Sequence, residues 1–382
     1  MKELFQTDIQ LAGGRLEITA SCGRSLLESL CGYASRQNKR RRFLFVSKVL
    51  GKHWPVLPSR MRDIYQQLAT DLVELEGPVV MIGMAETATG LAQGVYDSLI
   101  RAGARTDTLF LHTTRYHSSR HRLAFEFEEA HSHATEQLLY LPQDAAAQLI
   151  FHEARSVVIV DDEISTGNTM ANLVLEYHKL NPDLRSVRFV SITDWLGERQ
   201  DELRQRCSPL EVEFVNVLAG TFTFEPDEIF EIKNEVNVVG NAGCKDFCLP
   251  VNWGRFGVQG LPAVDFAPYE ASCGLTPGCT VLVLGSGEFS YPPFLFAEYL
   301  EEKGYLVHFQ SSTRSPIMLG NDIGVRLEFR DNYWDDIPNF IYNVKPERYD
   351  RIVACYETPI LPAGHNLPEL LAAVPLVFHE RS

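Results

Sequence analysis

The chain has 382 residues, 45% of them apolar, and carries a formal net charge of −15 at pH 7. This length suits two domains with full hydrophobic cores, and the negative charge argues against a dominant nucleic-acid surface, because phosphate backbones require clustered cations. No apolar run approaches the roughly 20 residues of a membrane span. The N-terminus has no signal-peptide character, so the eight cysteines are expected to be reduced thiols in a cytoplasmic protein.

The first 245 residues are expected to form one α/β domain, in which residues 1–76 are mostly a cap. Alternating or β-branched apolar runs predict the strands, and apolar residues at helical spacing predict the helices. The strands are expected at 16–21, 43–51, 78–84, 106–113, 138–142, 157–160, 187–195 and 212–224, and the helices at 61–75, 89–102, 144–151 and 170–180. Strands that alternate with helices in this way predict an open, mostly parallel sheet with helices on both faces.

Residues 246–278 are predicted to be a linker or an irregular layer, because glycine and proline interrupt every periodic pattern. A second, smaller, Rossmann-like α/β domain is expected over 279–382. It has predicted strands at 280–288, 305–311 and 351–357 and a helix at 292–304.

The second domain can be aligned with the first. Residues 79–116 match 281–315, and both segments end their second strand in Thr-Arg. In this alignment 351–359 matches VIVDDEIST of the first domain, so that Ala354 and Cys355 replace a pair of acids. The match indicates either a degenerate copy or only the general likeness of two strand–helix–strand units.

The most specific segment is VVIVDDEISTGNT at 157–169. Its β-branched run predicts a buried central strand, and Asp161 and Asp162 follow at the carboxyl end, where open α/β sheets bind ligands. Gly167 then allows a tight turn before a helix, so a phosphate would meet free amides, hydroxyls and the positive helix end. Two carboxylates beside a phosphate cradle predict a ligand with a vicinal diol, a metal ion and a phosphate monoester.

Phosphoribosyl pyrophosphate (PRPP) is such a ligand, and the segment resembles the PRPP loop of type I phosphoribosyltransferases. Receiver domains and NTPases also carry paired acids after a strand, but they lack the T-G-x-T turn. Together with Thr313-Arg314-Ser315-Pro316, the chain resembles, over nearly its whole length, the PRTase–TRSP proteins of bacterial tellurium-resistance and stress gene clusters. In these proteins an orotate-phosphoribosyltransferase-like domain precedes a domain named for that tetrapeptide.

The resemblance implies the type I phosphoribosyltransferase fold, with a cap or hood over the open sheet. It also implies an enzyme that forms or cleaves an N-glycosidic bond, with PRPP or a phosphoribosyl nucleotide and a nitrogenous base as ligands and Mg²⁺ as cofactor. Whether the chain forms a homodimer is left open by the sequence. Some purine enzymes place an acid where this chain has Ser165, so an orotate-type base is expected rather than a purine.

Residue roles follow from the same resemblance. Asp161 and Asp162 would bind the ribose hydroxyls, directly or through Mg²⁺, and their negative field would favour positive charge on the ribose. Residues 84–90 match the loop that binds the pyrophosphate. The expected PRPP and phosphate contacts are Glu163, Ser165, Thr166, Gly167, Asn168 and Thr169 in the first loop, and Ala85, Glu86 and Thr87 in the second.

Residues 115–122 carry five cationic or titratable side chains in eight positions and are expected to close over the pyrophosphate as a lid. A solvated basic loop is the alternative. Arg115 is the expected catalytic cation, and Arg120, His117 and His121 are the expected lid residues. The following stretch, 128–133, is expected at the hinge of the lid or near the ribose.

The base is expected beside Asp194 and Trp195, with the indole of Trp195 stacking on a planar acceptor. Lys48, Lys52 and His53 either reach the site from the cap or lie on a surface strand. We therefore expect a Mg²⁺-dependent phosphoribosyltransferase. The two alternatives are a non-catalytic PRPP-sensing regulator and an assembly module of a stress complex.

Overall fold

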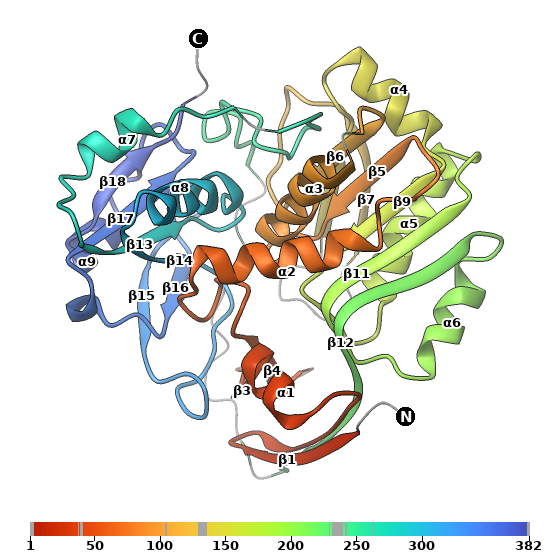
Figure 1. Ribbon diagram of the computed structural model, residues 1–382, viewed down its shortest axis with the longest axis horizontal. Helices are drawn as coiled ribbons and strands as arrows, with labels where there is room; N and C mark the ends of the chain where they lie inside the picture. Colours follow the sequence, from red (N-terminus) through yellow and green to blue (C-terminus); the bar gives the residue numbers. More distant parts are fainter. Residues whose placement is uncertain are drawn as a thin grey trace.

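The computed structural model describes residues 4–36, 38, 41–103, 105–128, 136–228, 230, 240, 243–261 and 263–379. Two α/β units lie side by side, and helices α2, α3 and α8 form a layer between them (Figure 1). The chain is therefore α/β, as its alternating pattern predicts.

An eight-stranded sheet forms the first unit, in the order β1-β2-β12-β11-β9-β5-β6, with β10 pairing with β11. Its strands are β1 (Phe5–Leu11), β2 (Gly14–Ala20), β5 (Val79–Gly83), β6 (Thr108–His112), β9 (Ser156–Val160), β10 (Glu163–Ile164), β11 (Ser186–Asp194) and β12 (Glu211–Pro226). The five strands from β12 to β6 are parallel, and the β1–β2 hairpin joins β12 antiparallel. The central strands are buried on both faces, which explains their continuous apolar sequence.

The cap consists of α1 (Arg24–Leu30) and the antiparallel pair β3 (Cys31–Ser35) and β4 (Phe43–Ser47). Helix α2 (Pro58–Thr70) starts three residues earlier than its apolar spacing predicts, because proline fits the first turn of a helix. The other elements are α3 (Thr89–Gly103), α4 (Ala145–Glu153), α5 (Asn168–Leu180), α6 (Arg199–Arg206) and the antiparallel strands β7 (Leu123–Glu128) and β8 (Glu136–Tyr140).

The second unit contains a four-stranded parallel sheet in the order β14-β13-β17-β18. These strands are β13 (Thr280–Gly285), β14 (Leu306–Ser311), β17 (Arg351–Tyr356) and β18 (Val374–Val377). Around them lie α7 (Ala267–Ser272), α8 (Tyr291–Glu302), α9 (Leu367–Leu371), a 3₁₀ turn at Pro346–Arg348 and the antiparallel pair β15 (Arg326–Arg330) and β16 (Pro338–Tyr342).

The two sheets share a strand order, since β6-β5-β9-β11 corresponds to β14-β13-β17-β18. Ile82 of β5 pairs with Ile159 of β9, and the equivalent Leu284 of β13 pairs with Ala354 of β17. Ala354 therefore matches Ile159 and not Asp161. The sequence alignment of residues 351–359 with the first domain is wrong by two residues. In the correct register Tyr356 matches Asp161 and Glu357 matches Asp162, so the second unit keeps one of the two acids.

The segment between the units is irregular but packed. Val258 exchanges two backbone hydrogen bonds with Phe110 of β6, at 2.9 and 3.0 Å. Arg255 and Phe256 are each only 1% exposed. The segment therefore belongs to the interface between the two sheets.

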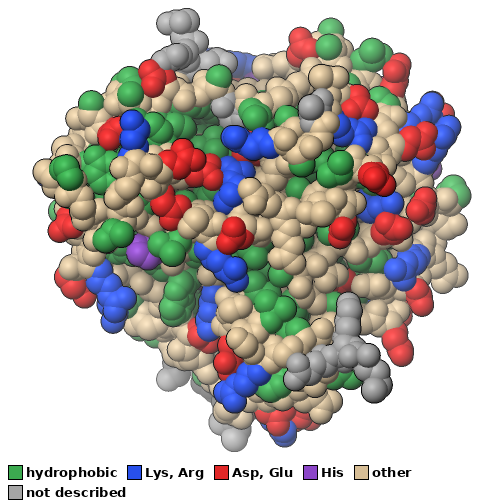
Figure 2. All heavy atoms as spheres, in the orientation of Figure 1, with side chains coloured by type: hydrophobic (Ala, Val, Ile, Leu, Met, Phe, Trp, Pro, Cys, Tyr) green, Lys and Arg blue, Asp and Glu red, His purple; other side chains and the backbone are tan. Residues whose placement is uncertain are grey.

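Cationic and anionic side chains are intermixed on the face shown in Figure 2, and neither sign forms a continuous patch there. Among the helices of the described ranges, none is both long and apolar enough to cross a membrane.

Candidate active site

Asp161 and Asp162 follow directly on β9, the strand that pairs with both β5 and β11. The Asp161 N–H donates to the carbonyl of Val190 at 3.0 Å, and the Asp162 N–H donates to Oδ1 of Asp161 at 2.9 Å. Both residues are partly exposed. The structure thus places two accessible acids at the carboxyl edge of the first sheet.

The charge of Asp162 is sensitive to its surroundings. Burial, followed by the nearby negative charge of Glu163, raises the pKa of Asp162 to about 6. Glu163 itself pairs with Arg41, which comes from the cap and lies over the ring of Phe43. The cap therefore supplies a cation to this acidic edge, where burial and Glu163 hold the pKa of Asp162 above its usual value.

The turn after the acids leads into α5. Gly167 has φ of 68°, a left-handed conformation that disfavours side chains, and a Cβ there would lie 2.3 Å from Leu203 Cδ1. The hydroxyls of Ser165 and Thr169 make no hydrogen bond to any described residue. Hydroxyls without partners beside the N-terminus of a 13-residue helix suit the binding of a phosphate.

The loop after β5 starts beside the end of β9, because the Met84 N–H donates to the carbonyl of Val160 at 2.9 Å. Thr113 and Gln137 hold the backbone of Ala85 with two hydrogen bonds of 2.8 Å. Glu86 is 9% exposed, and Thr87 is more open. The two loops expected to bind PRPP are therefore neighbours.

Two cations lie next to the Glu86 carboxylate, and one of them comes from the second unit. The Arg314 N–H donates to Oε1 of Glu86 at 3.3 Å, and Nε of Arg314 lies 3.7 Å from Oε2. Nζ of Lys52 lies 3.8 Å from Oε1 and also donates to the carbonyl of Gly287 at 2.6 Å. The arginine of the Thr-Arg-Ser-Pro motif thus faces the first unit.

The glutamate of the second unit, Glu288, makes the reciprocal contact with the first unit. The Arg115 N–H donates to Oε1 of Glu288 at 2.9 Å, and the Thr114 hydroxyl donates to Oε2 at 2.6 Å. Each unit therefore uses the glutamate after its first strand to bind the arginine after the second strand of the other unit. This exchange favours a degenerate copy over a general likeness of two α/β units.

The loops also match internally, as the alignment predicts. The Thr113 N–H donates to the carbonyl of Gly83 at 2.9 Å, and the Ser312 N–H donates to that of Gly285 at 3.0 Å. The Gly287 N–H then donates to the Ser312 hydroxyl at 2.9 Å, the counterpart of the contact between Ala85 and Thr113. The glycine–glutamate loop and the Thr-Arg strand end therefore converge in both units.

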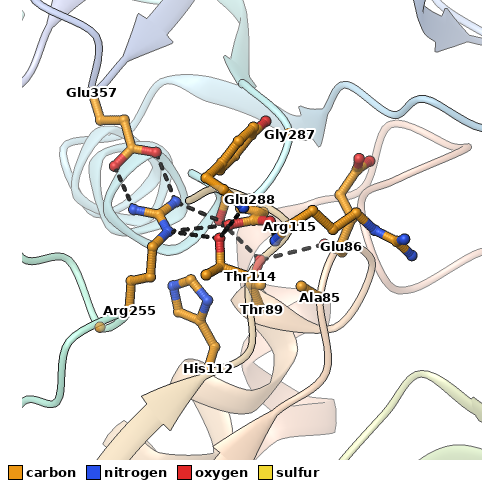
Figure 3. A network of polar contacts seen from close by, with 12 residues as sticks. Ala85, Glu86, Thr89, His112, Thr114, Arg115, Arg255, Gly287, Glu288 and Glu357 are labelled. Atoms are coloured by element: carbon orange, nitrogen blue, oxygen red, sulfur yellow. Dashed lines mark hydrogen bonds and ion pairs between the residues drawn. The ribbon is translucent and has the colours of Figure 1, made fainter. Parts of the chain in front are cut away.

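Arg255 joins the two units at a fully buried site. Its guanidinium donates to Glu288 at 3.1 Å and to both oxygens of Glu357 at 2.9 and 3.1 Å (Figure 3). Burial raises the pKa of Glu288, but Arg255, His112 and the hydrogen bond from Thr114 together hold it below its usual value. The acid of the second unit that matches Asp162 is therefore already neutralised by an internal cation.

The predicted lid packs on the second unit and on the segment between the units. Tyr116 stacks on Tyr333 with ring centroids 4.4 Å apart, and His121 stacks on Phe256 at 3.4 Å. The carbonyl of His117 accepts from the Lys245 N–H at 2.7 Å. The exposed Arg120 side chain is 4.0 Å from Asp246. The Arg115 side chain points away from Arg255 (Figure 3).

The residues expected beside the base are buried. Trp195 is 0% exposed and stacks on Phe45 at 4.5 Å, so its ring has no free face for a planar acceptor. Asp194 is 1% exposed and accepts hydrogen bonds from Leu196 and Gln200. Their backbone lies beside the acidic edge, since the Trp195 N–H donates to the carbonyl of Ile164 at 2.8 Å, but neither side chain is open to a ligand in this structure.

The three residues expected to reach the site from the cap, Lys48, Lys52 and His53, lie in different surroundings. Nζ of Lys48 lies 3.2 Å from Asp322 of the second unit, and His53 is buried against Tyr342. Of the three expected residues from the cap, only Lys52 reaches Glu86. Residues 129–133 of the histidine-containing stretch lie outside the described residues.

Sequence reasoning missed Arg41, Arg255 and Glu357. Arg41 belongs to a basic run directly before the apolar residues 43–46, with no motif that points to a ligand, and Arg255 lies in a segment without periodicity. Only the correct register of β13 and β17 would have indicated Glu357.

The residues of the acidic edge fit Mg²⁺ only in combination with a bound ligand. Within the described part of the chain, no cluster of three or more His, Cys, Asp or Glu side chains could hold a metal ion. Asp161 and Asp162 nevertheless offer carboxylate oxygens at one edge. Mg²⁺ is commonly held by one or two carboxylates together with waters and substrate phosphates.

Two family models match the chain. Residues 30–221 match the model described as phosphoribosyl transferase, and residues 254–374 match the TRSP domain that lies C-terminal to it. No curated protein is significantly similar to the chain in sequence.

The chain is similar to several solved structures at a low level. Adenine phosphoribosyl transferase from Trypanosoma brucei, in complex with AMP, pyrophosphate and ribose-5-phosphate, is 13% identical over 50% of this chain and 78% of its own, with a TM-score of 0.35. Orotate phosphoribosyltransferase from Mycobacterium tuberculosis H37Rv is 14% identical over 50% of this chain and 92% of its own, with a TM-score of 0.29. Likeness at this level says nothing about the base that this chain uses.

Proposed function

Because the chain belongs to the phosphoribosyl transferase family, whose model covers half of it, we propose that its first unit transfers a phosphoribosyl group between pyrophosphate and a nitrogenous base. The substrate is PRPP, or a phosphoribosyl nucleotide in the reverse direction. The observation that carries this proposal is the meeting of Asp161 and Asp162 with a hydroxyl-rich turn at the start of α5, in which the Ser165 and Thr169 hydroxyls have no partner among the described residues.

Asp161 and Asp162 accept hydrogen bonds from the two ribose hydroxyls. The residues from Ser165 to Thr169 bind the 5′-phosphate through backbone amides and hydroxyls. The two carboxylates, together with substrate oxygens, would hold Mg²⁺, which would supply positive charge against the pyrophosphate. The negative field of the two acids favours the positive charge that develops on the ribose as its C1–O bond breaks.

The pyrophosphate binds at the loop of residues 84–90 and leaves with the electron pair of the broken bond. A ring nitrogen of the base then forms the new bond to C1 with its own lone pair, and the proton that this nitrogen carried passes to the leaving pyrophosphate. Arg314 and Lys52 already lie at Glu86, and Arg115 follows β6 at the same edge. Guanidinium groups suit the oxygens of a pyrophosphate because they can bind two of them at once.

The base is of the orotate type. Ser165 stands where an acid would serve as general base, so a base that needs no deprotonation there fits this turn. Calorimetric titration with PRPP, with and without Mg²⁺, tests the ligand, and release of pyrophosphate with orotate, uracil, adenine and hypoxanthine tests the reaction. Absence of PRPP binding would contradict the whole proposal. Binding without turnover on any base would favour a PRPP-sensing regulator.

Replacing Arg314 or Arg115 with alanine should weaken the binding of PRPP and pyrophosphate about 10- to 100-fold, the usual range for a lost charge-assisted hydrogen bond. Ribose 5-phosphate should bind almost as before, because it lacks the pyrophosphate. Calorimetry with the three ligands measures both effects. Arg185→Ala is the matched control, since that side chain is 60% exposed and pairs with Glu76 at the surface, so its loss should matter little. Equal losses for ribose 5-phosphate and PRPP would rule out a pyrophosphate role.

Turnover should fall as the pH drops through about 6. The pKa of Asp162 is raised to this value by burial and by Glu163, and only the ionised acid binds as proposed. Glu163→Gln should move the midpoint of the pH profile of kcat/KM to lower pH, because it removes a neighbouring negative charge. A midpoint that stays in place in this variant would show that another group controls the profile.

A further inference from the structure

A cavity of about 200 Å³ is lined by residues of the first unit, of the segment between the units and of the second unit. Its lining includes Gln93 of α3, the segment from Val251 to Trp253, and Tyr269 of α7. None of the residues assigned to the proposed PRPP site lines it. The cavity is larger than the roughly 150 Å³ that suffices to bind benzene in an engineered protein core.

Gln93 gives the cavity a polar group that the protein leaves unused. The residue is only 4% exposed, and its side-chain amide makes no hydrogen bond to any residue in the described ranges. A buried amide without a partner costs free energy unless water or a ligand binds it. Since an amide carries both a donor and an acceptor, it suits a ligand that presents the complementary pair.

The walls are aromatic on the sides contributed by Trp253 and Tyr269. The ring centroids of Trp253 and Phe289 lie 5.9 Å apart. The Tyr269 ring stacks on Phe378, with ring centroids 4.6 Å apart. The indole N–H of Trp253 is buried and has no hydrogen-bond partner among the described residues. Rings held in this way offer flat surfaces to a planar ligand.

The charge of the lining argues against an anionic ligand. It contains the carboxylate of Asp265 and the imidazole of His379, and the described lining includes no lysine or arginine. A phosphate or a carboxylate would therefore lose its hydration without gaining a permanent cation, which is unfavourable. An uncharged ligand avoids this cost.

From these four observations we propose that this cavity is a second ligand site, which binds a planar, uncharged heterocycle of nucleobase size with its polar edge on Gln93. It is distinct from the PRPP site and does not depend on the reaction proposed for that site.

The cavity is connected to the contact between the units. Asn252 lines it, and the Asn252 side chain accepts hydrogen bonds from the N–H groups of Gly254 and Phe256 at 3.1 and 3.0 Å. Arg255 lies between these two residues and holds Glu288 and Glu357. A heterocycle in the cavity therefore lies against the turn that positions this arginine.

Titration of the full-length chain, labelled with ¹⁵N-tryptophan, with adenine and with uracil tests the proposal. The indole resonance of Trp253, assigned with the Trp253→Phe variant, should shift, and those of Trp54, Trp195 and Trp334 should not. Calorimetry should show at least about tenfold weaker binding in Gln93→Leu, which keeps the side-chain volume but removes the amide. Benzoate, a ring of similar size with a negative charge, should not bind.

Two further variants separate this cavity from the PRPP site. Binding should persist in Gln205→Leu, which changes an exposed glutamine of α6, and in the double variant Asp161→Asn/Asp162→Asn. The proposal is overturned if neither base shifts the Trp253 resonance at millimolar concentration, or if Gln93→Leu binds as tightly as the unmodified chain. Loss of binding in the double aspartate variant would assign the signal to the PRPP site and overturn it as well. If Gln93→Leu does not fold, the titration of the unmodified chain tests the proposal by itself, through the presence or absence of a shift in the Trp253 resonance.

Discussion

Replacing Asp161 and Asp162 together with asparagine should lower phosphoribosyl transfer by about 10²-fold or more, the loss typical when a preorganised electrostatic contact to the transition state is removed. Asparagine keeps the shape of each side chain but removes the negative field that favours the developing positive charge on the ribose. The rate of pyrophosphate release at saturating PRPP measures the effect.

The fold should survive this double change. Burial raises the pKa of Asp162, which means that its charged form is held at a cost that asparagine does not incur. Thermal unfolding should therefore show no loss of stability. Asp183→Asn is a suitable control, because that side chain is 77% exposed and should leave turnover unchanged. If the double variant keeps full turnover, the acidic edge is not the reaction site.

Arg255→Ala should lower the free energy of unfolding by about 3–5 kcal/mol, the cost of breaking a buried ion pair on one side. The side chains of Arg255, Glu288 and Glu357 are each no more than 2% exposed. Without the guanidinium, two carboxylates remain buried without their main cation. Chemical denaturation measures the change.

Arg24→Ala is the control for this experiment. Its pair with Glu28 is also an ion pair, but the two side chains are 71% and 57% exposed, and such a pair within one helix contributes about 0.3–0.5 kcal/mol. Adding Glu357→Gln to Arg255→Ala should recover part of the loss, because one buried charge disappears. A loss no larger than that of the control would show that the network does not hold the two units together.

The second unit contributes directly to the first in this structure. Arg314 reaches the loop of Glu86, and Glu288 binds the backbone of Arg115. Both contacts depend on the same arrangement of strand, glutamate and arginine in the two units. A variant that separates the units should therefore disturb the proposed pyrophosphate loop as well as the interface.

The sequence alone determined most strands and helices of both sheets, because a strand buried on both faces must be apolar throughout and a helix on a sheet must be apolar on one side. It also placed Asp161 and Asp162 correctly at the end of β9, since the acids follow the apolar run without a gap. The short elements α1, β3, β7, β15 and β16, which the sequence did not indicate, carry too few periodic residues to show a pattern.

Only the tertiary structure decided the register between the two units. A shift of two residues keeps every side chain of a strand on the same face, so the apolar pattern is equally satisfied in both alignments. The pairing of Leu284 with Ala354 is what identifies Glu357 as the counterpart of Asp162.

The sequence also could not predict which side chains surround a given residue. Trp195 follows directly on β11, close to where the pattern ends the strand, but its ring stacks on Phe45 of the cap, which lies 150 positions away in the chain. Arg255 lies in an irregular segment, and its role depends on two glutamates that the fold brings to it. Local spacing determines which strand a residue ends, whereas contacts between distant segments determine whether that residue faces a ligand, the core or the other unit.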